Sequence, residues 1–367
     1  MSDQALAALS TQVLWAAFFV AMAFGAIVQR TGFCTMGGVA DVVTMGDWTR
    51  LRQWALAAGV AMLGFALMAQ AGVIRPGLVL YASNRLIWLS ALVGGVLFGF
   101  GMVLASGCVS KNLVRIGGGN MKSLVVTLVL GLSAFATLKG LSAVWRSATV
   151  DRVAVDFAGN ANLAAWAAQA TGLAPATAGL TVALLLGGAL LAWALAGREF
   201  LCTNNLLAGL GVGAAVLAMW WVSGHLGHLA EHPQTLEESF IATNSGRAEA
   251  LSFVAPVAYT LDWLMYFSDR NKLLTVGMAS VFGAIAGSFT MALAQRSFRW
   301  EGFGSTGDLG HHLAGAVLMG VGGVTAMGCS IGQGVSGVST LSATSFIAVA
   351  AMVGGAVAAL RYQAWRA

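Results

Sequence analysis

A glycine-rich apolar stretch that occurs twice in the chain decides the fold. Residues 92–108 read LVGGVLFGFGMVLASGC, and residues 313–329 read LAGAVLMGVGGVTAMGC. Both stretches end in a Gly-Cys pair, at Cys108 and at Cys329. Aligned without gaps, they also match at Gly94 and Gly315, Gly99 and Gly320, Gly101 and Gly322, and Ala105 and Ala326. A shared glycine ladder with the same ending indicates an internal repeat.

The composition around these stretches is that of a membrane protein. Hydrophobic residues make up 58% of the chain and charged residues 9%, whereas about a quarter of a soluble domain is charged. The 48 glycines and 4 prolines suit transmembrane helices, in which small residues let backbones approach closely. The formal net charge of +5 is not gathered into a basic face, which excludes nucleic-acid binding.

A transmembrane helix needs about 20 mostly apolar residues, and the chain contains nine such runs. We therefore predict an all-α polytopic membrane helical bundle with about nine crossings. They lie near 12–29, 53–73, 86–106, 122–141, 176–197, 205–222, 274–294, 310–328 and 342–360. The stretches 143–174 and 223–273 are more polar, and we expect them to lie outside the membrane with short helices at 163–170 and 250–266.

The repeat copies end the third and the eighth crossings, so four crossings lie between them and the copies run antiparallel. This is an inverted repeat, an arrangement in which transporters bind substrate at the repeat interface near mid-membrane. We interpret residues 1–367 as a single transmembrane domain, with an N-terminal half at about 12–142, a linker at 143–175 and a C-terminal half at about 176–361. Placing the N-terminus outside and the C-terminus inside puts most of the 19 Lys and Arg residues on the inner side.

The chain changes character after each Gly-Cys. Residues 109–119 read VSKNLVRIGGG, and residues 330–340 read SIGQGVSGVST. We expect neither segment to be a continuous helix and predict that both are re-entrant, because irregular backbone is tolerated at membrane depth only where it is buried or lines a cavity. Their free N–H groups, together with Ser330 and Gln333, would bind an anion as helix N-termini do.

A third cysteine, Cys34, lies in the similar sequence QRTGFCTMGG (29–38). A thiol is a weak hydrogen-bond donor and a soft, polarisable group, so thiols at three glycine-broken helix ends favour a sulfur-containing solute. Binding of a soft metal is the competing interpretation, but no His lies near these cysteines in sequence, and we expect neither a metal nor a cofactor. Cys202 lacks the Gly-Cys frame and is interpreted as structural.

Several polar residues near these elements are further candidates for substrate binding. Lys111 and Arg115 follow Cys108 and would neutralise an anion. Asn205, which opens the sixth crossing, either caps the helix or binds solute. A histidine cluster in the second polar stretch fits a solvated loop better than a zinc site; it consists of His225, His228 and His232.

The sequence resembles the YeeE/YedE sulfur-transport family over about 20–360. The similarity lies in the elements GFC (32–34), ASGC (105–108), FGAIAGS (282–288), FRW (298–300) and GCSIGQGVSG (328–337). The resemblance implies uptake of thiosulfate or a related inorganic sulfur anion across the bacterial inner membrane. It also implies a positively biased central path in which Cys34, Cys108 and Cys329 pass the anion along, and a TusA-type cytosolic sulfur carrier as partner. The VSKN sequence after Cys108 departs from the family pattern, where a glycine is expected.

Two functions remain as hypotheses. The first is a thiosulfate-class transporter, which is not an enzyme and whose thiols stay neutral because a thiolate would repel the anion. The alternative is a membrane thiol or sulfur-transfer enzyme that uses Cys108 or Cys329 covalently, which would require a reactive thiolate. Lys111 would favour such a thiolate at Cys108, but no comparable cation follows Cys329.

Overall fold

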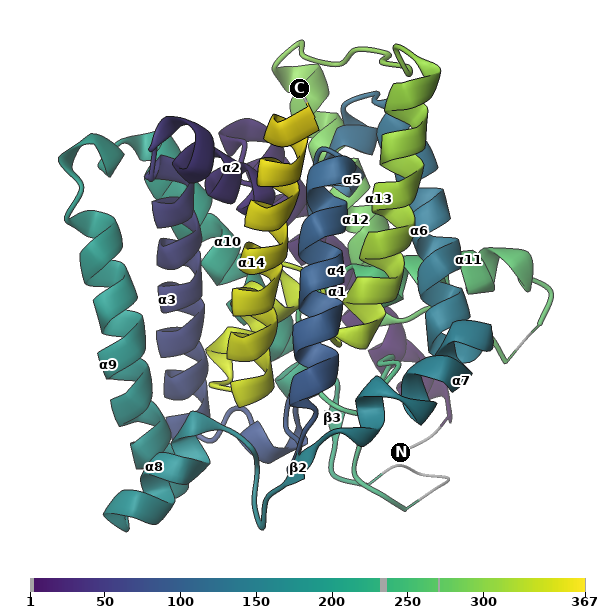
Figure 1. Cartoon of the computed structure of the whole chain (residues 1–367). Coiled ribbons are helices and arrows are strands. Elements are labelled where there is room, and N and C mark those ends of the chain that lie inside the picture. Colours follow the sequence, from purple (N-terminus) through teal and green to yellow (C-terminus); the bar gives the residue numbers. More distant parts are fainter. Residues whose placement is uncertain (1–2, 232–235, 270, 367) are drawn as a thin grey trace.

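A computed structural model describes residues 3–231, 236–269 and 271–366, and these residues form an almost entirely helical bundle (Figure 1). All nine predicted crossings are long helices in this part of the chain. They are α1 (Asp3–Thr31), α3 (Thr49–Gln70), α4 (Trp88–Leu104), α6 (Met121–Lys139), α9 (Pro175–Leu195), α10 (Thr203–Trp221), α12 (Val276–Ala294), α13 (Thr306–Thr325) and α14 (Ala343–Arg366).

Eight spans among the described residues are long and apolar enough to cross a membrane, and they contain every long helix except α13. α13 is of similar length, but its first turns carry Asp308, His311 and His312, which lower its mean hydropathy. It nevertheless packs lengthwise between α4 and α6 inside the bundle. The prediction of an all-α polytopic membrane protein is therefore confirmed.

Shorter elements connect the long helices. The predicted short helices in the two polar stretches are present as α8 (Leu163–Thr171) and α11 (Val254–Met265). Two small antiparallel pairs of strands lie near the end of the bundle that carries the N-terminus (Figure 1). The remaining elements are α2 (Thr35–Met45), α5 (Val109–Gly117), α7 (Leu141–Ala148), η1 (Pro76–Leu78), η2 (Val150–Arg152), η3 (Arg198–Phe200), η4 (Val222–Leu226), η5 (Gly332–Gly337), β1 (Arg85–Leu86), β2 (Val155–Asp156), β3 (His228–Leu229) and β4 (Ser239–Phe240).

The two glycine ladders of the repeat pack directly against each other. A Cβ atom added to Gly94 would lie 2.7 Å from the carbonyl oxygen of Gly322, and one added to Gly322 would lie 2.7 Å from that of Gly94. Gly101 and Gly315 approach each other in the same way, at 2.7 and 2.6 Å. Because residue numbers rise along α4 as they fall along α13 at these contacts, the two helices are antiparallel. Only glycine permits backbones to approach this closely.

The packing of the other helices follows the same two-fold pattern. α1 packs on α12 as α10 packs on α3, and α4 packs on α14 as α13 packs on α6. We propose that α1–α6 and α10–α14 are the two inverted halves of one transmembrane domain and that α7–α9 link them. This proposed division differs from the sequence interpretation, which ended the linker at 175 and counted the α9 segment in the C-terminal half.

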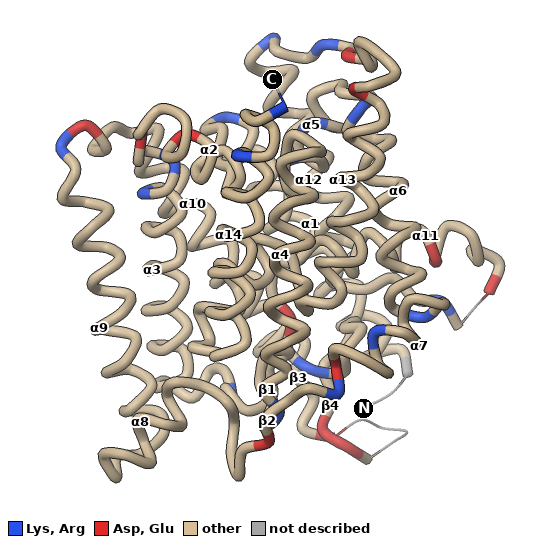
Figure 2. Tube along the Cα trace, viewed as in Figure 1, with Lys and Arg blue, Asp and Glu red and all other residues tan. Residues whose placement is uncertain are grey.

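Charged residues are concentrated at the two ends of the bundle, and the middle is nearly free of them (Figure 2). The N- and C-termini lie at opposite ends (Figure 1), as an odd number of crossings requires. This distribution is typical of a protein whose middle layer faces hydrocarbon, because a charge at that depth is costly.

Candidate functional site

The three glycine-framed cysteines each follow a helix that ends in a left-handed residue. Gly32, Ser106 and Met327 have φ values of 70°, 54° and 57°, and each stands two positions before its cysteine. Ser106 and Met327 are equivalent positions of the repeat. Left-handed backbone is uncommon for residues other than glycine, and such strain gathers at functional sites.

Cys34 is the N-cap of α2 and Cys108 is the N-cap of α5. Cys329 precedes η5 and accepts a hydrogen bond from its first residue. The Cys34 Sγ accepts a hydrogen bond from the Gly37 N–H at 3.3 Å, and the Cys329 Sγ accepts one from the Gly332 N–H at 3.3 Å. Cys108 is the N-cap of α5, and its Sγ lies 3.2 Å from the Ser110 hydroxyl. The thiols are therefore held at the N-terminal ends of helical turns, where the local field favours negative charge.

The fold brings these three cysteines together in its interior. Cys34, Cys108 and Cys329 are 8%, 1% and 0% exposed, and all are free thiols. Cys34 and Ser330 are neighbours of the Cys108 thiol, and Cys329 lies near it. Segments from both halves thus contribute sulfur atoms to one buried cluster.

Ser330 has the features of an unsatisfied binding group. It is 2% exposed, and its Oγ has no hydrogen-bond partner in good geometry among the described residues. A buried hydroxyl without a partner carries a desolvation cost, which a bound anion next to Cys108 would relieve.

Two amide side chains stabilise the helix breaks, which are the irregular turns 105–108 after α4 and 326–331 after α13. The Asn112 Nδ2 donates to the carbonyls of Gly107 and Cys108 at 3.0 and 3.1 Å. The Gln333 Nε2 donates to the Ala326 carbonyl at 2.6 Å, and its Oε1 accepts from the Ser345 hydroxyl at 2.6 Å. The Gln333 amide, which was predicted to bind the anion, makes these contacts within the fold, and its role in binding stays a prediction. Asn112 was not predicted, although it occupies the Gln333 position of the repeat.

The expectation that residues 109–119 are not a continuous helix is wrong. Val109–Gly117 form α5, and the irregular backbone is confined to the residues just before it. The glycines at 117–119 end this helix rather than interrupt it. With 9 residues, α5 is too short to cross the roughly 30 Å hydrocarbon core. The second segment is interrupted as expected, by turns around the π-helical η5.

A cationic cavity of about 640 Å³ reaches the cluster from one end of the bundle. Cys34 and Ser106 lie in its wall, and the Arg115 Nη1 donates to the Ser106 carbonyl at 2.6 Å. The predicted cations Lys111 and Arg115 are joined there by Arg50, Lys122 and Arg299, which were not predicted to bind substrate. The charged lining residues are Arg50, Lys111, Arg115, Lys122, Arg299, Glu301 and Asp308, so cations outnumber acids.

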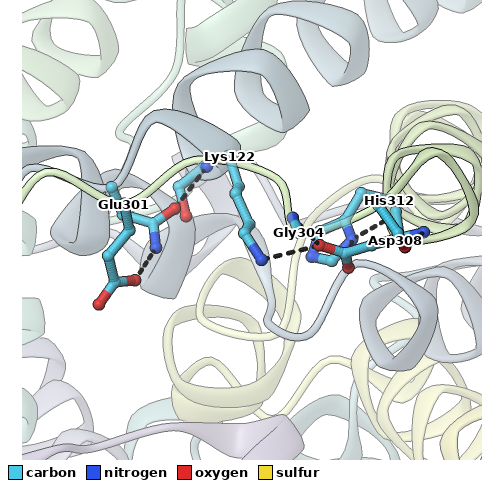
Figure 3. A network of polar contacts seen from close by, with 8 residues as sticks. Lys122, Glu301, Gly304, Asp308 and His312 are labelled. Atoms are coloured by element: carbon cyan, nitrogen blue, oxygen red, sulfur yellow. Dashed lines mark hydrogen bonds and ion pairs between the residues drawn. The ribbon is translucent and has the colours of Figure 1, made fainter.

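The rim of this first cavity is tied together by polar contacts (Figure 3). The Lys122 Nζ lies 2.7 Å from the Asp308 Oδ2, and the His312 Nδ1 lies 3.0 Å from the Asp308 Oδ1. Nearby, the Asn120 Nδ2 donates to Glu301 at 2.5 Å. These contacts connect the α12–α13 loop to the start of α6. Among the described residues, Lys111, Arg115 and Arg299 have no acidic partner.

A second cavity, of about 330 Å³, approaches the cluster from the opposite end. Lys122 in the first turn of α6 lines the first cavity, whereas Leu138 in its last turn lines the second. Met327 and Gly328, which immediately precede Cys329, lie in the wall of this second cavity. Equivalent helix breaks of the repeat therefore open toward opposite ends of the molecule.

The other sequence candidates lie away from the thiols. The Asn205 Oδ1 accepts from the Gln53 Nε2 at 2.8 Å, its Nδ2 donates to the Phe200 carbonyl at 3.2 Å, and it lines neither cavity. Cys202 is exposed. His228 pairs with Glu238 at 2.6 Å, whereas His232 lies outside the described residues. Among the described residues, no group of three or more His, Cys, Asp or Glu side chains could hold a metal ion.

Comparison with known proteins gives a consistent result over nearly the whole chain. A family model described as "Sulphur transport" matches residues 30–358. A thiosulfate transporter TsuA from Spirochaeta thermophila is 26% identical over 349 residues, which are 92% of this chain and 94% of the relative. A thiosulfate transporter TsuA from Escherichia coli is 28% identical over 350 residues, 90% of this chain and 89% of the relative. A probable transporter YedE from Escherichia coli is 28% identical over 112 residues, 30% of this chain and 26% of the relative.

Proposed function

We propose that this chain, which belongs to the sulphur-transport family, moves thiosulfate or a closely related sulfur anion through the bilayer along its three buried thiols. At the coarser level, it is a multi-pass membrane transporter for a sulfur anion and not an enzyme. One observation carries the finer proposal: Cys34, Cys108 and Cys329 form a cluster between cavities that open at opposite ends of the bundle.

The chemistry of the cluster supports the proposal. A neutral thiol donates a weak hydrogen bond and offers a polarisable surface, both of which suit the terminal sulfur of thiosulfate. The hydroxyls of Ser110 and Ser330 lie beside Cys108 and would donate to the oxygens of the same anion. Several weak donors in series favour passage, because conduction requires binding that is weak enough for release.

The two cavities and the orientation predicted from the sequence together suggest an entry side and an exit side for the anion. We propose that the chain lies in the bacterial inner membrane with its N-terminus outside and its C-terminus inside, so that the anion enters through the second cavity. It would leave through the first cavity, where Lys111, Arg115 and Arg299 attract it away from the thiols. A TusA-type sulfur carrier in the cytosol would receive the anion at that end.

The test is uptake of labelled thiosulfate, sulfate and sulfite into proteoliposomes that contain the purified full chain. The proposal expects uptake of thiosulfate above protein-free liposomes, and much weaker uptake of sulfate, which lacks a terminal sulfur. Equal uptake of thiosulfate and sulfate would contradict the role of the thiols. A persulfide trapped on Cys108 or Cys329 during turnover would instead favour the sulfur-transfer alternative.

A further inference from the structure

The second cavity contains an acidic group that the transport path described above does not use. Glu249 lies in the segment between the α10 and α12 crossings, outside both, and its side chain lines this cavity. Among the described residues of the lining, the other charged ones are Arg146 and Asp151, which pair with each other at 3.0 Å. Since that pair is neutral, the ionisation of Glu249 sets the net charge of the cavity.

The Glu249 segment leads directly to the thiol cluster. Its residues 249–253 are held by Ser223 and Ser336, whose hydroxyls donate to the carbonyls of Glu249 and Leu251. Further along the segment, the Phe253 backbone lies beside the Cys329 thiol, and Ser252 packs on Gly332. An anion that reaches Cys329 from the second cavity must therefore pass the wall that carries Glu249.

We propose that Glu249 is a proton-linked gate for the transported anion at the mouth of the second cavity. The ionised carboxylate repels the anion from Cys329, and the protonated carboxyl admits it, so anion binding at this mouth takes up a proton from that side. This inference rests on the proposed function and adds the residue that would couple anion entry to protons.

The surroundings of Glu249 support protonation within an accessible pH range. Its Oε1 accepts a hydrogen bond from the Ser245 N–H at 2.8 Å, and no cation lies within ion-pair distance of it among the described residues. Burial raises the pKa of the Glu249 carboxyl above its usual range. Titratable or charged groups around it are Arg247 on its own segment, Tyr81 after η1, Tyr259 on α11, Arg146 on α7 and Asp151 in η2.

The sign of the pH dependence follows from this raised pKa. Above it, Glu249 is ionised and opposes a dianion; below it, the carboxyl is neutral and the opposition disappears. Thiosulfate remains a dianion throughout the pH range in which a carboxyl titrates in a protein. Uptake should therefore increase as the pH on the second-cavity side falls through the pKa of Glu249. We expect an increase of about tenfold, which is the effect on anion binding if the bound anion and the Glu249 charge disfavour each other by the equivalent of one pKa unit.

The experiment compares initial rates of thiosulfate uptake between pH 5 and 8 for the wild type, Glu249→Gln and Asp156→Asn in proteoliposomes. Glutamine keeps the acceptor for the Ser245 N–H, so the turn is preserved while the charge is lost. We expect Glu249→Gln to be fast and independent of pH. Asp156→Asn, an equal change of charge at an exposed site on the same end, should keep the wild-type profile. A Glu249→Gln protein with the wild-type pH profile overturns the proposal.

A second measurement uses the wild type alone and decides the matter if Glu249→Gln fails to insert. Thiosulfate added to weakly buffered detergent-solubilised protein should cause proton uptake that is largest near the midpoint of the uptake profile. If thiosulfate binds without any proton uptake, the gate is excluded while the transport function stands. Absence of thiosulfate uptake by the wild type at every pH would instead refute the proposed function itself.

Discussion

The helix break after α4 and the helix break after α13 share a backbone but differ in chemistry. Both contain a left-handed residue two positions before the cysteine, and both are braced by an amide four positions after it. The side chains between these points diverge: Lys111 stands where the second copy has Gly332, and Val109 stands where it has Ser330. The repeated unit thus holds a thiol in the same backbone geometry in both copies, and the side chains around the thiol differ between the two copies.

The environments of the two breaks differ in the same sense. Ser106 opens to a cavity with an excess of Lys and Arg, whereas Met327 opens to one whose net charge depends on Glu249. A symmetric backbone therefore supports an asymmetric electrostatic path. Because charge acts on an anion over longer distances than shape, we expect this difference to make the two cavities bind an anion unequally.

The largest expected effect tests whether both thiols are needed. Cys108→Ser and Cys329→Ser should each lower thiosulfate uptake about 100-fold, equivalent to about 2.7 kcal/mol, because a hydroxyl cannot offer a polarisable sulfur. Serine is a good N-cap, so the helix starts should be retained. Uptake is measured per inserted protein, with Cys202→Ser as a control that stays at the wild-type rate. Normal uptake by either variant would mean that the two breaks are not functionally equivalent.

The next effect tests the shared scaffold at the helix crossing. A Cβ atom on Gly94 would lie 2.4 Å from the Ala326 nitrogen, and one on Gly315 would lie 2.6 Å from the Ala105 nitrogen. Gly94→Ala and Gly315→Ala should therefore each destabilise the protein by about 1–3 kcal/mol, measured as a lower Tm in detergent. Gly354→Ala, where nothing lies within 4 Å, is the matched control. Very different losses for Gly94→Ala and Gly315→Ala would argue against a two-fold crossing.

A smaller effect concerns the amides that brace the breaks. Asn112→Ala and Gln333→Ala should each cost about 1–2 kcal/mol, because buried carbonyls lose their donors. Thermal unfolding in detergent measures this cost, and Asn271→Ala at an exposed site should change stability by less than about 0.5 kcal/mol. If Gln333→Ala abolishes thiosulfate binding while stability is unchanged, Gln333 contacts the anion as the sequence predicted.

The smallest expected effect concerns the charge that distinguishes the two breaks. Lys111→Gln should raise the KM for thiosulfate about threefold, equivalent to about 0.7 kcal/mol, because one of several cations in the first cavity is lost. The increase should shrink at high salt, which screens exposed charges. Arg366→Gln, at the same end of the bundle but outside the cavity, should leave the KM unchanged. An unchanged KM for Lys111→Gln would assign this lysine to membrane topology.

Features of the fold that depend on a single physical requirement could be predicted from the sequence. Apolar length is sufficient to locate a crossing, so every long helix was predicted, and the Gly-Cys endings located the breaks at Cys108 and Cys329. The helical state of 109–117 was missed because three following glycines suggested irregular backbone, whereas Asn120, the N-cap of α6, shows that they form a turn between two helices.

The roles that depend on tertiary contacts could not be predicted in this way. Arg50 and Arg299 reach the same cavity from distant parts of the chain, and nothing in their local sequence distinguishes them from cations that set topology. Asn205 is a plausible binding residue by sequence, but its partner Gln53 lies on another helix. The bracing role of Asn112 was accessible, since extending the repeat alignment four residues beyond the cysteines pairs it with Gln333.

The contact between α4 and α13 also restricts how the chain can move. Gly94, Gly101, Gly315 and Gly322 place main-chain atoms of the two helices against each other with no intervening side chains. Sliding or tilting of either helix would separate these surfaces and forfeit their dispersion energy, so rocking of one half against the other is disfavoured. We therefore expect substrate translocation to require only small rearrangements at the turns capped by the cysteines, with the α4–α13 contact unchanged.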